Sequence, residues 1–120
     1  MNIDPISIKR GEVWFVMLDP ARGAEMRKTR PAVVISSDSA GRLPIKLIAP
    51  MTEWKDAFAA NQWLVRIDPD RENGLTKISA VDVLQIRGMD VHRFRAKLGS
   101  MSNDNMKRLA GTIRMTLELP

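Results

Sequence analysis

RGEVWFVMLDPARGAEMRKTRPAVVISSD, residues 10–38, is the stretch that decides the fold of this chain. Its apolar runs, residues 12–18 and 32–35, are rich in β-branched and aromatic side chains, which predicts two strands. Two to five residues suffice for most hairpin connections, so a loop over residues 19–30 is expected to have a functional or packing reason. A basic loop on rigid strands is typical of an anion-binding site. The basic side chains of this loop are Arg22, Arg27, Lys28 and Arg30, with Glu25 among them.

Short strands continue after this stretch. We expect strands over residues 45–52 and 63–67, one long bent strand or two short ones over 76–88, and an edge strand over 95–101. Trp63 alternates with its neighbours in a way that favours core packing. This order of elements predicts a mainly β protein, a small β-barrel with appended helices, as one domain over residues 1–120.

A C-terminal α-helix is the clearest single element. Apolar side chains recur at helical spacing and would line one face. Ser102 is the expected N-cap, with Asn103 or Asp104 as alternatives. Its basic side chains point elsewhere, and a solvated face is the commoner reason for such residues. The apolar side chains are Met106, Leu109, Ala110, Ile113 and Leu117.

Composition narrows the classes of partner. The net charge is +5 and the pI is about 10.1, which favours a polyanionic partner. Basic residues outnumber acidic ones before residue 51 and after residue 92, so a fold that brings these two segments together would create one basic face. The chain has no cysteine, no leader-like apolar segment and no run long enough to span a membrane, so we expect a cytoplasmic protein without membrane partners.

Several chemistries are excluded by the residues present. His92 is the only histidine, which excludes a two-histidine ribonuclease mechanism and a histidine-bearing metal cluster within one chain. We interpret His92 as structural or exposed. Motifs for nucleotide cofactors and serine hydrolases are absent from the sequence. We therefore expect neither a cofactor nor a metal.

The remaining side chains suit the cleavage of RNA, which carries its own nucleophile in the ribose 2′-hydroxyl. The forked donors of Arg30 match phosphate oxygens. Thr52 could donate to a non-bridging oxygen, and Glu25 could orient Arg30 or accept the 2′-proton. On composition alone, the preferred interpretation is a non-catalytic one for each residue: a surface charge for Arg30, a strand-end hydroxyl for Thr52 and a salt-bridge partner for Glu25.

The order of the motifs resembles a known family. Residues 10–14 (RGEVW), 18–20 (LDP), Gly23 with Glu25, and 30–34 (RPAVV) resemble the opening of MazF/PemK (Kid-like) toxins. Residues 50–52 (PMT), the segment 74–79 with Lys77, and 85–90 (QIRGMD) continue the resemblance, which runs from about residue 9 to residue 117.

The resemblance implies an SH3-like small β-barrel of the MazF/Kid/CcdB type that forms a homodimer. It also implies a growth-inhibiting toxin of a type II toxin–antitoxin system, held in check by a cognate antitoxin. Such toxins are metal-independent, sequence-specific endoribonucleases (mRNA interferases) that cut single-stranded RNA, leaving a 2′,3′-cyclic phosphate and a 5′-hydroxyl. Arg30, Thr52 and Glu25 match the family's catalytic positions.

Further residues are expected to contact RNA. These are Arg27, Lys28, Trp54, Lys77 and Arg87, with Trp54 a candidate for stacking on a base and Arg87 equally suited to a buried ion pair at the dimer interface. Asp82 and Leu84 stand where the Kid branch carries an arginine and an aspartate, so the mechanism of that branch does not transfer whole. Two rival classes stay open: a non-enzymatic CcdB-like gyrase poison, and a basic RNA-binding module without chemistry.

Overall fold

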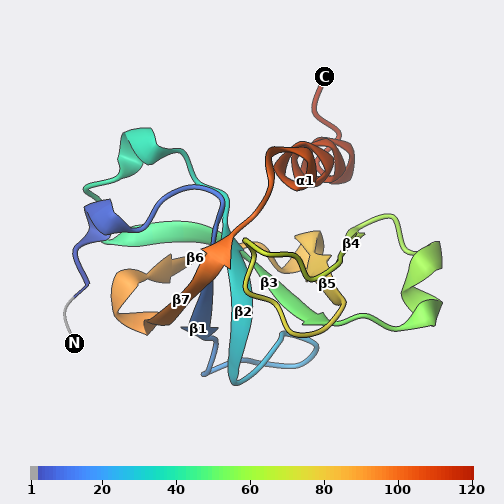
Figure 1. Cartoon of the computed structure of the whole chain (residues 1–120), viewed down its shortest axis with the longest axis horizontal. Helices are drawn as coiled ribbons and strands as arrows, with labels where there is room; N and C mark the ends of the chain where they lie inside the picture. The colour runs from blue at the N-terminus through green and yellow to red at the C-terminus, as the bar shows by residue number, and fades with distance from the viewer. Residues whose placement is uncertain (1–2) are drawn as a thin grey trace.

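Over residues 3–120, which the computed structural model describes, the chain forms seven antiparallel strands and one α-helix (Figure 1). The strands are β1 (Glu12–Met17), β2 (Thr29–Val34), β3 (Ile45–Glu53), β4 (Leu64–Ile67), β5 (Ser79–Asp82), β6 (Arg87–Asp90) and β7 (Phe94–Ser100), and the helix is α1 (Asn103–Thr116). Short 3₁₀ turns lie in the connections: η1 (Pro5–Ser7), η2 (Asp38–Ala40), η3 (Asp56–Ala60), η4 (Val83–Gln85) and η5 (Val91–Arg93).

Strand β3 organises the sheet because it has different neighbours along its length. Its first half pairs with β6, its middle pairs with β2 on the other side, and its last three residues pair with β5. The strand order is β4-β5-β3-β2-β1-β7, with β6 off this path. The mainly β architecture with a C-terminal helix is therefore confirmed. Within residues 3–120 the ladder does not close into a ring, since β4 and β7 are its two ends.

The central strands are buried on both faces, which explains their nearly continuous apolar sequence. Val13, Val33 and Ala49 face one cluster of the core, together with Leu109 of α1. Their neighbours in the sequence face a second cluster, which includes Trp14, Ala32, Val34, Ile48 and Phe94. This alternation fixes the register of β1, β2 and β3, because a shift by one residue would exchange the two faces.

The predicted strands are present, with changes at their ends. β2 begins at Thr29 rather than at residue 32, because Thr29 and Arg30 pair with Met17 and Val16 of β1. The connection between the strands is therefore residues 18–28, which we call the basic loop. The segment 76–88 contains two short strands separated by η4, and β7 is the edge strand beside β1.

Three predictions about apolar side chains were wrong. Ala110 of α1 is exposed and does not pack in the core. Leu117 is 62% exposed because α1 ends one residue earlier, at Thr116, so the helix packs through Leu109, Met106 and Ile113 instead. Trp63 is 38% exposed because β4 begins only at Leu64. The predicted N-cap is confirmed, since the Ser102 hydroxyl accepts the backbone N–H of Asn105 at 3.1 Å.

Basic residues from the two ends of the chain do meet, but beside α1. Arg10, Lys107 and Arg114 line one cavity of about 590 Å³ there. In Figure 1 this helix lies at the top of the molecule and the basic loop at the bottom. His92 is exposed, as expected, and its Nδ1 lies 2.7 Å from Asp90. No helix within residues 3–120 has the length and apolar character needed to cross a membrane.

Candidate active site

A cleft of about 290 Å³ opens between the strands and the segment that precedes β5. Strands β1, β2, β3, β5 and β7 all contribute to its walls. Its lining residues are Phe15, Arg30, Pro31, Met51, Thr52, Glu53, Gly74, Leu75, Thr76, Lys77, Ser79 and Leu98. Three residues that the sequence singled out, Arg30, Thr52 and Lys77, are thus brought together although they are far apart in the chain.

Strand pairing fixes the positions of Arg30 and Thr52. Arg30 lies opposite Val16 in the β1–β2 ladder, and its Nε donates to the carbonyl of Arg27 at 3.3 Å. Thr52 lies opposite Ala80 in the β3–β5 ladder and is half-buried. A guanidinium and a hydroxyl held on rigid strands can both donate to the oxygens of a phosphate without first being ordered.

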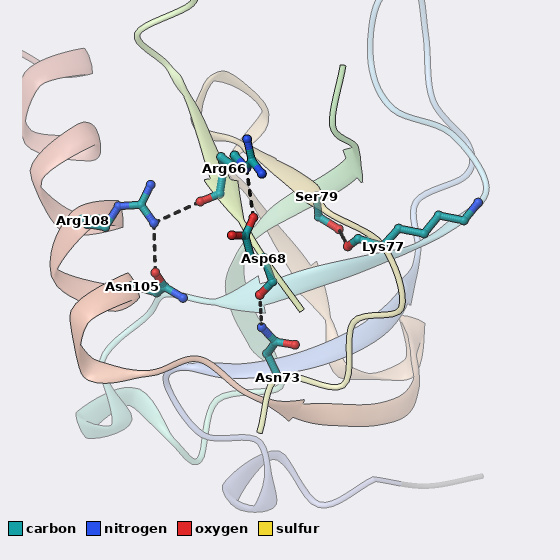
Figure 2. Close-up of polar contacts among 7 residues, drawn as sticks. All are labelled: Arg66, Asp68, Asn73, Lys77, Ser79, Asn105 and Arg108. Atoms are coloured by element: carbon teal, nitrogen blue, oxygen red, sulfur yellow. Dashed lines mark hydrogen bonds and ion pairs between the residues drawn. The ribbon is translucent and has the colours of Figure 1, made fainter. Parts of the chain in front are cut away.

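Lys77 adds a second cation to the cleft. Its Nζ lies 3.7 Å from Glu53, and both side chains are well exposed. Figure 2 shows the Lys77 side chain extended away from Ser79, whose hydroxyl donates to the carbonyl of Lys77 at 2.9 Å. With Arg30 and Lys77 against the single carboxylate of Glu53, the cleft has a net positive charge and favours an anion.

The wall of the cleft that carries Lys77 is held by a buried asparagine. Asn73 is fully buried; its side-chain amide donates to the carbonyl of Asp68 at 2.9 Å, and its oxygen accepts the N–H groups of Asp70 and Leu75. Gly74 follows with φ +70°, and a Cβ there would lie 2.1 Å from the carbonyl oxygen of Leu98 in β7. Only glycine allows the wall to approach β7 this closely.

The basic loop does not place its carboxylate in the cleft. Glu25 is exposed, and its Oε1 accepts the backbone N–H of Arg22 at 2.7 Å, closing a turn inside the loop. Arg27 and Lys28 are exposed on the same loop. Their side chains are accessible to a large polyanion, and their contact with RNA stays a prediction, as does the catalytic role of Glu25.

Trp54 lies just beyond β3 and outside the cleft lining. Its ring packs edge-to-face on Phe58 with 5.8 Å between centroids, and the Arg66 guanidinium lies 5.8 Å from its centroid. Arg66 also pairs with Asp68 at 2.9 Å, and Arg108 of α1 donates to the carbonyl of Arg66 (Figure 2). Base stacking on Trp54 therefore stays a prediction, beside an observed role in local packing.

Arg87 is half-buried at the start of β6 and is turned toward the basic loop. Its Nη2 donates to the carbonyl of Leu18 at 2.9 Å, and its Nε is buried without a hydrogen-bond partner. This contact gives Arg87 a supporting role that the sequence did not indicate. Contact between Arg87 and RNA, or an ion pair with a second copy of the chain, stays a prediction.

Sequence reasoning did not single out several residues of the cleft, among them Phe15 and Glu53. Phe15 is an exposed aromatic ring on β1, opposite Pro31. It shares a face of β1 with Val13, which is fully buried, so alternation alone could not distinguish the buried position from the exposed one.

A comparison with models of known protein families identifies the family of this chain. Residues 9–117 match the family model described as PemK-like, MazF-like toxin of type II toxin-antitoxin system. The chain belongs to this family. The match includes Arg30 and Thr52 together with every strand of the sheet.

Individual members of the PemK/MazF family are similar over nearly their whole length. Endoribonuclease MazF9 of Mycobacterium tuberculosis is 30% identical over 93% of this chain and 98% of its own. Endoribonuclease MazF of Staphylococcus saprophyticus is 29% identical over 93% and 92%.

Solved structures of MazF proteins share the fold. MazF from Deinococcus radiodurans superposes with a TM-score of 0.76 at 20% identity, covering 92% of this chain and 96% of the other. An endoribonuclease from a mycobacterial species, solved in complex with its cognate antitoxin, gives a TM-score of 0.75 at 17% identity over 93% and 96%. The predicted MazF-type fold is therefore confirmed.

Proposed function

We propose that this toxin is a metal-independent, sequence-specific endoribonuclease that cuts single-stranded RNA. The observation that carries the proposal is the meeting of Arg30 and Thr52 in one positively charged cleft. Relatives named as endoribonucleases, similar over almost the entire chain, support the same activity. Residues 3–120 hold no group of three or more histidine, cysteine, aspartate or glutamate side chains suited to a metal ion, and the chemistry proposed below does not call for one.

The reaction uses the nucleophile of the substrate. The ribose 2′-hydroxyl gives up its proton as its oxygen attacks the adjacent phosphorus. The bond from phosphorus to the 5′-oxygen breaks and the 5′-oxygen takes up a proton, so the products are a 2′,3′-cyclic phosphate and a 5′-hydroxyl. Arg30 neutralises the negative charge that develops on the phosphorane, and Thr52 donates to a non-bridging oxygen. Lys77, at the mouth of the same cleft, holds the neighbouring backbone by charge.

Glu25 is proposed as the residue that orients Arg30 or accepts the 2′-proton, on the resemblance alone. Arg27, Lys28, Trp54 and Arg87 are proposed to contact RNA outside the cleft. The positive charge of the basic loop supports this for Arg27 and Lys28, both of which are exposed. A sequence-independent charge contact of this kind attracts and positions RNA, while the choice of bases requires contacts to their edges.

Two partners complete the proposal. The toxin forms a homodimer, supported by Ile45 and Leu47, which expose about half of their surface on the outer side of β3. These two side chains lie beside Gly88 of the paired strand β6 and form a continuous apolar strip. A cognate antitoxin silences the dimer, and the solved complex of a related endoribonuclease with its own antitoxin supports a partner of this kind. The proposed location is the cytoplasm.

The test is cleavage of a long defined single-stranded RNA in the presence of EDTA, with sequencing of the new 5′-hydroxyl ends. We expect Arg30→Ala to lower kcat by about 100- to 1000-fold, the usual effect of removing one donor to a developing oxyanion. Arg42→Ala is the matched control, because Arg42 is exposed before β3 and outside the cleft.

Intact RNA with the unmodified protein in EDTA would contradict the proposal. Gyrase inhibition without cleavage would then indicate a CcdB-like poison, and RNA binding alone would indicate a module without chemistry. Full activity of Arg30→Ala would contradict the assigned mechanism even if RNA is cut. Circular dichroism and thermal unfolding of the variant show whether its fold is intact.

A further inference from the structure

The basic loop is supported from outside by three side chains of one later segment. Arg93 donates to the carbonyls of Met17 and Asp19, and Arg87 donates to the carbonyl of Leu18, so these two residues hold the start of the loop. Gln85, the last residue of η4, holds the middle of the loop. The segment 85–93 therefore acts as the support on which the loop rests.

Gln85 binds the loop backbone on both sides of Glu25. Its side-chain oxygen accepts the N–H of Met26 at 2.5 Å, and its side-chain nitrogen donates to the carbonyl of Ala24 at 3.4 Å. The same nitrogen also donates to Asp82 at 3.1 Å. Because a carboxylate only accepts, Asp82 fixes the nitrogen end of the amide toward itself and leaves the oxygen to face Met26.

The backbone bonds of the loop alone leave this part weakly held. One bond, from the N–H of Leu18 to the carbonyl of Lys28 at 2.8 Å, closes its base, and another closes the turn between Arg22 and Glu25. Met26 stands between these two points. Its side chain packs against the second core cluster, and its backbone N–H is bonded to Gln85. The residues that follow Met26 are Arg27 and Lys28, the exposed cations of the loop.

We propose that Gln85 is a positioning residue for RNA recognition. It fixes the backbone at residues 24–26 so that Arg27 and Lys28 are presented to RNA in one arrangement, and it does not itself touch the substrate. The assignment rests on the proposed endoribonuclease function. Its distinguishing consequence is an effect on RNA binding that is larger than the effect on the chemical step. The backbones of Arg30 and Thr52 are held by strand pairing, whereas Glu25 and the Arg27 carbonyl that accepts from Arg30 lie in the supported loop.

The first test is Gln85→Ala in steady-state cleavage of single-stranded RNA. Two neutral hydrogen bonds are together worth on the order of a tenfold change in an equilibrium constant. We therefore expect KM to rise about tenfold and kcat at saturating RNA to fall by a smaller factor than KM rises. Gln62→Ala is the matched control and should behave like the unmodified protein, because Gln62 is exposed before β4.

The second test is a pH series with Gln85→Glu. The new carboxylate keeps the acceptor for Met26 but loses both donors, and it faces the negative charge of Asp82. A neighbouring like charge favours the protonated acid, which regains one donor. We expect kcat/KM of this variant, divided by that of the unmodified protein at the same pH, to rise as the pH is lowered. A merely destabilised variant would show no such recovery.

Amide hydrogen exchange separates this inference from the proposed function. In Gln85→Ala, exchange at the Met26 amide should become at least several-fold faster, while amides of β1 and β2 keep their rates. If the unmodified protein cuts no RNA, the endoribonuclease proposal fails and the exchange result still tests the loop support. Unchanged KM together with unchanged exchange at Met26 would overturn the assignment, as would a loss confined to kcat.

Discussion

Glu12 is a buried carboxylate outside the cleft, at the start of β1. Its oxygens accept hydrogen bonds from the backbone of Lys9 at 2.8 Å and the ring of Trp14 at 3.2 Å, and they pair with Lys97 of β7 at 2.7 Å. Burial is the largest single influence and raises the pKa of Glu12, but these partners together lower the pKa below its ordinary value. The ionised form is thus preferred in the folded protein.

This preference makes stability depend on pH in a definite direction. A carboxyl whose pKa is lower in the folded state stabilises the protein above its unfolded pKa, and the contribution disappears as the pH falls through the folded pKa. We expect Glu12→Gln to lower the free energy of unfolding by about 1 kcal/mol at neutral pH, and by less in acid.

Urea unfolding gives the free energy of unfolding at neutral pH and at a pH below the ordinary glutamate pKa of about 4.3. Glu118→Gln, at an exposed position near the C-terminus, is the control and should leave the free energy of unfolding unchanged at both pH values. An equal loss of stability at both pH values would show that Glu12 acts through its shape and not through its charge.

At the level of elements, the loop over residues 68–75 is a rigid wall of the cleft although it contains no regular structure. Asp70 accepts the N–H groups of Glu72 and Asn73, and the backbone N–H of Ser100 in β7 donates to the carbonyl of Glu72 at 2.8 Å. Together with the buried amide of Asn73, these bonds attach the wall to the sheet.

We expect Asn73→Ala to destabilise the protein by about 2 kcal/mol, because it leaves buried backbone groups without partners. RNA cleavage should fall as well, since Lys77 is carried on the same wall. Thermal unfolding and cleavage assays measure the two effects. Asn103→Ala, an exposed position at the first turn of α1, should leave both unchanged, and a stable but inactive Asn73→Ala would contradict the expected coupling.

The elements themselves were largely predictable, because their signals are local. Strands β1–β3 are apolar along their length because both of their faces are buried. In α1 the spacing of Met106, Leu109 and Ile113 follows from the burial of one face. The position of Leu117 was not predictable, since a helix end is set by caps and not by periodicity. The anchoring of the loop by Gln85 was invisible as well, because the partners are 59 and 61 residues apart.

The candidate site was predictable in part for the same reason. Arg30 and Thr52 were chosen from chemistry and resemblance, and the strand ladders place them in one cleft. Phe15 and Ser79 carry no local signal of exposure to a cleft. Glu25 was chosen from its neighbours in the loop, and its contact with Arg22 became visible only in three dimensions.

For the whole molecule, β3 links the proposed dimer to the cleft. Ile45 and Leu47 lie in its first half, and Thr52 lies near its end. We expect Leu47→Lys to convert the dimer to monomers, because a charge in an apolar interface must be desolvated without a partner.

Analytical ultracentrifugation gives the oligomeric state of this variant, and the cleavage assay gives its activity, which should be reduced if RNA spans both copies. Ile6→Lys replaces an equally exposed apolar residue in η1 and should stay dimeric. A dimeric Leu47→Lys protein would place the interface elsewhere.

The order of the strands in the sheet has a consequence for the synthesis of this toxin. β1 lies between β2 and β7, so the first strand to be translated gains one of its two neighbours only when the last strand has been translated. Leu98 of β7 also lines the cleft. A chain still growing on the ribosome therefore lacks a finished cleft until β7 has been translated. We expect a chain truncated before β7 to cut no RNA in the same cleavage assay, because its cleft lacks Leu98 and β1 lacks one of its two neighbours.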